Sequence, residues 1–88
     1  MKIKNGFISR KVAGNNVVVA TGEQSKCFNG IIKLNESGLI LWDKLLGGAD
    51  EAQLADALLA EYDIDRATAE ADVSRFVGVL RDAGAIED

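Results

Sequence analysis

The amino-acid sequence predicts one α+β domain with a winged-helix-like order, in which a three-stranded antiparallel sheet is followed by three helices (βββααα). Three observations predict this fold class. Runs rich in β-branched and aromatic residues occur within residues 1–34, the apolar spacing becomes helical after Asn35, and 88 residues with 48% apolar content suit one small core. A small sheet leaves edges and amphipathic helices leave apolar stripes, so packing one layer on the other buries both.

The first two strands are predicted as a hairpin. Residues 7–13 (FISRKVA) and 16–21 (NVVVAT) are rich in strand-forming residues, and Gly14-Asn15 between them is a turn signal. A polar loop is expected next, around Gly22–Lys26. A third strand is predicted over residues 28–34 (FNGIIKL), although its Asn-Gly pair could instead form a turn that shortens the strand.

Capping residues predict where three helices begin and end. Asn35 is a strong N-cap and Gly47-Gly48 stop the first helix; Asp50 begins the second, with Gln53 completing a capping box. Asp65 caps the third and longest helix, which Gly84 ends in a left-handed conformation before a short tail. The apolar positions at helical spacing are Leu39, Trp42, Leu45 and Leu46, then Leu54, Leu58 and Tyr62, then Ala69, Val73, Phe76, Val77, Leu80 and Ala83. Trp42 is expected to fill the space between sheet and helices.

The sequence offers few residues that could serve in catalysis or metal binding. There is no histidine, and Cys27 is the single cysteine, so neither a disulfide nor a cysteine-based zinc site can form within the chain. The glycines form no phosphate-binding motif. We therefore expect no catalytic residue, no metal and no cofactor. A reducing, cytoplasmic location fits the lone cysteine, and neither a signal peptide nor a membrane span is apparent.

The charge is divided unevenly. Residues 1–34 carry a net charge of +5 and residues 35–88 carry −9. A winged-helix nucleic-acid binder is the alternative that the element order suggests, because its third helix would read bases. The arginines of the third helix are balanced by carboxylates, which argues against phosphate binding. The basic residues of the strand half keep this alternative open.

The junction between the third strand and the first helix carries a more specific pattern. Leu34-Asn35-Glu36-Ser37-Gly38, with Trp42 four residues on, resembles the PqqD-like family, named for protein D of pyrroloquinoline quinone biosynthesis. The resemblance covers nearly the whole chain. It continues through Leu45-Leu46-Gly47-Gly48, through Glu61-Tyr62-Asp63-Ile64, and through Asp72-Val73, Phe76-Val77 and Leu80, closed by Gly84.

This resemblance implies a non-catalytic adaptor. Proteins of this kind are recognition elements for enzymes that modify ribosomally made peptides. An extended leader peptide would lie beside the third strand, in a cleft between that strand and the third helix, and its core segment would be presented to a modifying enzyme of the radical SAM class. Strand addition of this kind needs an unpaired sheet edge. Because such an edge can also pair with a second copy, a homodimer is a further expectation to test.

Alternation and helical spacing predict which residues would line the cleft. If Ile32 and Leu34 point inward, Ile31 and Lys33 point to the other face of the strand, where we expect the peptide. A one-residue change of register would exchange these two pairs. On the third helix, Val73, Val77 and Leu80 are predicted to face the core, and the strip beside them is predicted to face the peptide, with Arg75 at its rim. Alternatively, Phe76 is core and Arg75 is merely solvated. The predicted peptide-binding residues are Phe28, Ile31, Lys33, Ala69, Asp72, Arg75, Phe76 and Val79.

Overall fold

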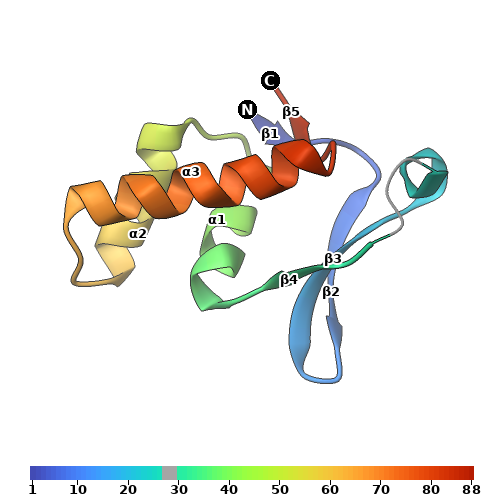
Figure 1. Cartoon of the computed structure of the whole chain (residues 1–88), viewed down its shortest axis with the longest axis horizontal. Helices are drawn as coiled ribbons and strands as arrows, with labels where there is room; N and C mark the ends of the chain where they lie inside the picture. Colours follow the sequence, from blue (N-terminus) through green and yellow to red (C-terminus); the bar gives the residue numbers. More distant parts are fainter. Residues whose placement is uncertain (27–29) are drawn as a thin grey trace.

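Two small sheets and three helices make up the computed structural model of this chain (Figure 1). The structure describes residues 1–26 and 30–88. The predicted order, a three-stranded antiparallel sheet followed by three helices, is confirmed. The elements are β1 (Lys2–Ile3), β2 (Phe7–Val12), β3 (Asn15–Ala20), the 3-10 helix η1 (Gly22–Lys26), β4 (Ile32–Leu34), α1 (Glu36–Leu46), α2 (Glu51–Glu61), α3 (Arg66–Asp82) and β5 (Ile86–Glu87).

The β2–β3 hairpin turns one residue earlier than predicted. Val12 pairs with Asn15, so the loop is Ala13-Gly14, and both residues have positive φ, 52° and 82°. Two consecutive positive φ values are typical of the type I′ turn, whose twist matches that of the flanking strands. Glycine takes the second position readily. The predicted turn residue Asn15 therefore begins β3, and the predicted strand residue Ala13 lies in the turn.

The third strand of the main sheet, β4, is shorter than predicted. It covers Ile32–Leu34 only, and it pairs antiparallel with β3 so that Leu34 lies opposite Asn16 and Ile32 opposite Val18. The predicted beginning of the strand at Phe28, like Cys27, lies outside the described residues. The segment expected as a polar loop after β3 is the 3-10 helix η1.

The helices begin at the predicted caps. The Asn35 side-chain oxygen accepts a hydrogen bond of 2.8 Å from the amide of Gly38, and the Asp65 carboxylate accepts one of 2.8 Å from the amide of Thr68. Asp50 and Gln53 form the predicted capping box, each side chain accepting from the backbone amide of the other. These bonds satisfy amides that have no partner within a helix.

The second sheet was not predicted. β1 and β5 pair antiparallel, with Lys2 opposite Glu87 and Ile3 opposite Ile86, so the two ends of the chain lie side by side (Figure 1). Strands of two residues are too short to show an alternating pattern, and their pairing joins positions more than eighty residues apart. Only the path of the intervening chain brings them together.

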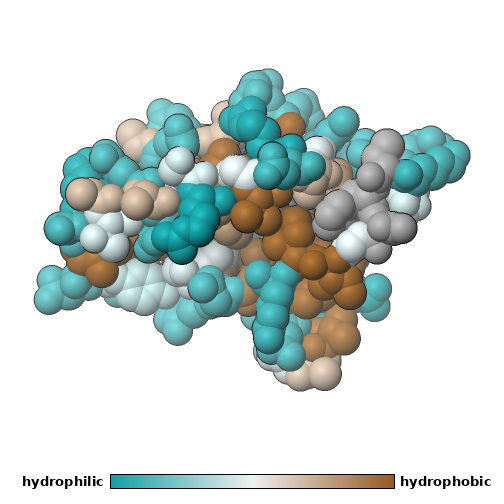
Figure 2. Space-filling model, in the orientation of Figure 1, coloured by the Kyte–Doolittle hydropathy of each residue, from teal (hydrophilic) through white to brown (hydrophobic). Residues whose placement is uncertain are grey.

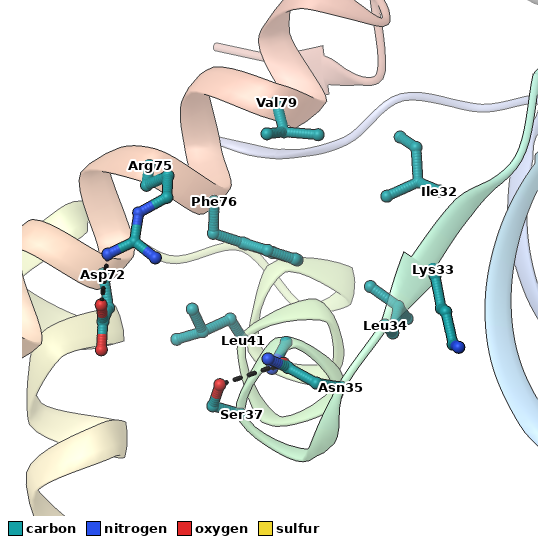
Figure 3. Close-up of a pocket in the computed structure, with 11 residues that line it drawn as sticks. Ile32, Lys33, Leu34, Asn35, Ser37, Leu41, Asp72, Arg75, Phe76 and Val79 are labelled. Atoms are coloured by element: carbon teal, nitrogen blue, oxygen red, sulfur yellow. Dashed lines mark hydrogen bonds and ion pairs between the residues drawn. The ribbon is translucent and has the colours of Figure 1, made fainter.

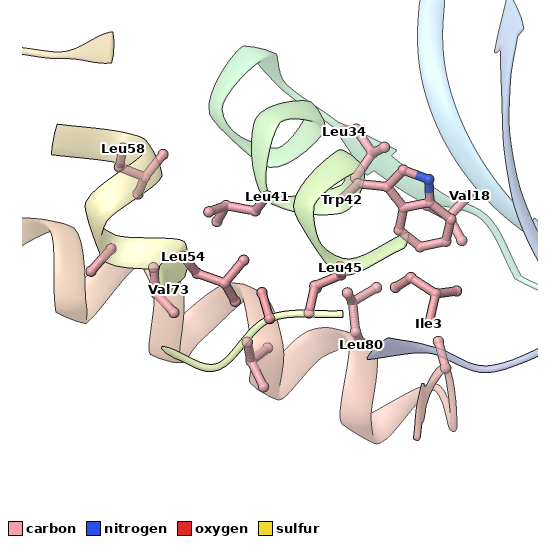
Figure 4. Close-up of a cluster of buried hydrophobic side chains, with 14 of the residues drawn as sticks. Ile3, Val18, Leu34, Leu41, Trp42, Leu45, Leu54, Leu58, Val73 and Leu80 are labelled. Carbon is pink, nitrogen blue, oxygen red and sulfur yellow. The ribbon is translucent and has the colours of Figure 1, made fainter. Parts of the chain in front are cut away.

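Trp42 lies fully buried between the sheet and the helices, as expected, with Leu34 and Val18 beside it (Figure 4). Its indole nitrogen has no hydrogen-bond partner among the described residues. α3 closes the core with one face. The residues of that face are Ala69, Val73, Val77 and Leu80, all at most 4% exposed. The prediction that Val73, Val77 and Leu80 face the core is confirmed.

Candidate functional site

A cleft of about 430 Å³ separates β4 from the middle of α3 and has the first turn of α1 as its floor (Figure 3). This volume lies within the roughly 300–1,000 Å³ typical of ligand pockets. In the space-filling view, apolar surface gathers between α3 and the main sheet (Figure 2). The cleft is lined by Ile32, Lys33, Leu34, Asn35, Ser37, Gly38, Leu41, Asp72, Arg75, Phe76 and Val79.

Apolar side chains form the two long walls of the cleft. From β4, Ile32 and Leu34 point toward α3, whereas the side chain of Lys33 points away from it (Figure 3). From α3, Phe76 is half-buried and Val79 is 46% exposed. Facing apolar surfaces that remain partly open to water can gain free energy when another apolar group covers them.

Gly38 shapes the floor of the cleft. A Cβ atom at this position would lie 3.3 Å from Cε1 of Phe76 and 3.1 Å from Oδ1 of Asn35. The absence of a side chain therefore allows the Phe76 ring to lie directly against the first turn of α1. Sequence reasoning did not single out Gly38 for the site. The available signal was a glycine within a predicted helix, which lowers helix stability and often has a packing reason.

Polar groups occupy the rim of the cleft. The Arg75 guanidinium contacts the Asp72 carboxylate at 2.7 Å, and the hydroxyl of Ser37 donates to the side-chain oxygen of Asn35 at 3.1 Å (Figure 3). The Arg75 side chain is 73% exposed, and an exposed pair of this kind contributes about 0–1 kcal/mol to stability. These groups remain accessible to a ligand in the cleft.

One edge of β4 borders the cleft. The main sheet has the strand order β2-β3-β4, so β3 is the one strand that pairs with β4 among the described residues. β3 lies on the side of β4 away from α3 (Figure 1). In an antiparallel strand, alternate residues direct their amide and carbonyl groups to the outer edge, where an added extended segment can pair with them.

Of the eight predicted site residues, the structure brings five to the cleft and places two outside its lining, and the eighth is not among the described residues. Lys33, Asp72, Arg75, Phe76 and Val79 line it. Ile31 lies outside the lining and is 67% exposed, and Phe28 lies outside the described residues.

The predicted position of Ala69 beside the peptide is wrong. Ala69 is 0% exposed, because it stands one helical turn before Val73 on the face of α3 that packs into the core. The prediction also put Ile31, rather than Ile32, across the cleft from α3. The face of β4 that packs on the core also forms the cleft wall, so the inward-pointing Ile32 and Leu34 line it.

The described residues contain neither a metal-binding cluster nor a membrane-spanning helix. No group of three or more histidine, cysteine, aspartate or glutamate side chains in the described part of the chain is arranged to hold a metal ion. No helix among those residues is both long and apolar enough to cross a membrane.

Comparison with known proteins identifies both the family and the fold. The family model described as coenzyme PQQ synthesis protein D (PqqD) matches residues 16–86. The structure of TbiB1 in complex with the TbiA(beta) leader peptide superposes with a TM-score of 0.79 at 26% identity, covering 99% of this chain and 95% of that one. Lasso peptide synthetase B1 complexed with the leader peptide superposes with a TM-score of 0.76 at 21% identity, covering 99% and 96%. No curated protein sequence matches the chain.

Proposed function

The chain belongs to the PqqD family, and on that premise we propose that it is a non-catalytic adaptor that captures the leader segment of a ribosomally made precursor peptide. The leader adds as an extended strand to the open edge of β4 and lies in the cleft between β4 and α3. The observation that carries this proposal is the apolar cleft directly beside an edge of β4 with which no other described strand pairs. TbiB1 has the same fold over nearly the whole chain, and its structure contains it in complex with a leader peptide.

Backbone pairing alone cannot supply the affinity. β4 has three residues, so an added strand makes about two to four hydrogen bonds with it. Each bond contributes about 0.5–1.5 kcal/mol net, whereas ordering a flexible peptide costs about 2–5 kcal/mol or more. The remainder comes from apolar peptide side chains that cover Ile32, Phe76 and Val79 in the cleft.

The partner that receives the captured peptide is a modifying enzyme, and by analogy with the family we propose an enzyme of the radical SAM class. An adaptor makes no bond itself. It raises the local concentration of the precursor's core segment at the enzyme, because binding of the leader makes the second encounter intramolecular. The lone cysteine and the cofactor chemistry of such enzymes both suit the reducing cytoplasm, where we place the protein.

A peptide titration tests the proposal. Synthetic leader peptides encoded beside this gene are added to isotope-labelled protein while the amide resonances are recorded. Shifts should concentrate in residues 30–34 and along α3. Saturating binding that leaves β4 unshifted would rule out strand addition at this edge. Sedimentation of the same samples shows whether a second copy occupies the edge before peptide is added.

A further inference from the structure

A second hollow of about 310 Å³ adjoins the cleft at the first turn of α1. The two hollows share Asn35, Ser37 and Asp72 in their linings, so they lie next to each other. A peptide that leaves the cleft past Ser37 would therefore reach the second hollow within a short distance. Its position depends on the end of α2 and the segment that joins α2 to α3.

The interior of the second hollow is apolar. Leu58, from the last turn of α2, is 1% exposed, and Tyr62 and Ile64, which follow the helix, are half-buried. An aliphatic stem of several methylene groups could pack against these three side chains. The aromatic ring of Tyr62 also offers a face on which a cation is favoured.

The charged side chains that line the hollow are both acidic. Glu36 and Asp72 line it, and no lysine or arginine does. Asp72 is paired with Arg75, but Glu36 has no ion-pair partner among the described residues. The carboxyl end of α2, which carries partial negative charge, has no basic residue in its last turn and ends at Glu61.

The hydroxyl group of Tyr62 is affected by the same negative charges. Its pKa is raised above the ordinary value of 10.0, first by partial burial, then by the negative charge of Glu36 and by hydrogen bonding to its carboxylate, with a smaller contribution from Glu61. A positive group placed here would offset these charges. An acidic side chain would be repelled, and a purely apolar one would leave Glu36 without a cation.

On the basis of the proposed function, we propose that this hollow receives a lysine or arginine side chain of the bound precursor peptide. The aliphatic stem packs on Leu58, Tyr62 and Ile64, and the cationic end lies beside Glu36. The protein thereby selects precursors that carry a basic residue at a fixed distance from the apolar residues held in the cleft. The acidic lining points to the residue type, and the adjacency of the two hollows points to its place.

A displayed library of random 16-residue peptides tests this proposal. The library is selected in parallel on the wild-type chain, on Glu36→Gln and on Asp43→Asn. Asp43 is the matched control, because it is an exposed carboxylate on the same helix that lines neither hollow. The wild type and Asp43→Asn should enrich lysine or arginine at one fixed spacing from the apolar positions, and Glu36→Gln should lose this preference.

One enriched peptide is then synthesised with its basic residue and with methionine in its place. The methionine version should bind the wild type about three- to tenfold more weakly, as expected for a partly exposed ion pair with a buried stem, and the difference should shrink on Glu36→Gln. Enriched peptides without a fixed basic position, or an undiminished preference on Glu36→Gln, would overturn this inference and leave the proposed function standing. A selection that enriches no sequence above the level seen with Phe76→Ala would defeat both.

Discussion

Phe76 is half-buried, although Val77 beside it is only 4% exposed. Helical geometry explains the difference, because neighbouring residues point about 100° apart and only one of them can face the core. The exposed part of the ring forms a wall of the cleft opposite Ile32 (Figure 3). The ring therefore packs partly on the core and partly lines the cleft, and its part in peptide binding stays a proposal.

Replacing Phe76 with alanine should therefore weaken leader-peptide binding more than it weakens the fold. We expect affinity to fall about tenfold or more, as for an aromatic anchor. The loss of stability should remain below the roughly 3–5 kcal/mol of a fully buried phenylalanine. Leu80→Ala is the control, because Leu80 is 0% exposed and its truncation should cost about 2–5 kcal/mol. Fluorescence anisotropy and chemical denaturation measure the two effects. A Phe76→Ala chain as unstable as the Leu80 variant would assign the ring to the core.

Gly38 allows a second experiment on single residues. In Gly38→Ala, the new methyl group would press on the Phe76 ring, which can yield only toward the open cleft. Peptide affinity should fall, while the change in stability stays within about 1 kcal/mol, because the improved helix propensity of alanine offsets the crowding.

Gly78→Ala is the matched control for Gly38→Ala. Gly78 also lies inside a helix, but a Cβ atom there would meet nothing within 4 Å. This variant should gain about 0.5–1 kcal/mol in stability and bind peptide as the wild type does. Equal peptide affinity in both alanine variants would show that Gly38 does not control the depth of the cleft.

Among the elements, the β2–β3 hairpin carries a strained turn. Ala13 has φ of 52°, a left-handed conformation that costs an L-residue about 1–2 kcal/mol. Asparagine tolerates this conformation and is preferred at the first position of a type I′ turn. Ala13→Asn should therefore raise the thermal unfolding midpoint by roughly 2–6 °C. Gly14→Ala, at φ of 82°, should lower it. If both variants melt at the wild-type temperature, the turn is not of this type.

The N-terminus of α3 predicts how stability depends on pH. Hydrogen bonding to Thr68 lowers the pKa of the Asp65 carboxyl below its ordinary value of 3.8. A carboxyl whose pKa is lower in the folded chain stabilises the fold above its unfolded pKa, and this contribution is lost as the pH falls through the folded pKa. The contribution of Asp65 should therefore be full above about pH 3.8, decline as the pH falls below that value, and be gone once the pH is below the lowered pKa of the folded chain.

The comparison with Asp65→Asn isolates this contribution, because asparagine also caps helices but does not titrate. Thermal unfolding midpoints of both chains are measured from pH 5 down to pH 2.5. The wild type should lose stability relative to the variant over the acidic end of this range. Parallel curves for the two chains would contradict the assignment of Asp65 as a charged cap.

At the scale of the whole molecule, the distribution of charge distinguishes peptide binding from nucleic-acid binding. Each arginine of α3 is within 4.0 Å of a carboxylate: Arg66 contacts Asp56 and Glu70, Arg75 contacts Asp72, and Arg81 contacts Asp88. A helix that reads DNA needs cations free to neutralise phosphates. The chain should therefore cause no shift of a 20-base-pair duplex at low salt. A salt-dependent shift would favour the winged-helix alternative.

The order of the elements, the three helix caps and most of the core face of α3 were predictable from the sequence. Each depends on residues no more than four positions apart, as in Asn35 with Gly38 or Val73 with Val77, and such signals are visible in the chain itself. For the site, the same spacing put Asp72, Phe76 and Val79 on one strip of α3, and all three line the cleft; that they contact a peptide stays a prediction.

Tertiary structure alone decided the pairing of β1 with β5, the burial of Ala69 and the place of Gly38 beneath Phe76. These features depend on how far α1 and α3 lie from the sheet, and the packing around Trp42 determines those separations. Local patterns state which face of an element is apolar. They do not state how closely another element approaches that face, because that distance results from side chains far apart in the sequence that fill one common core.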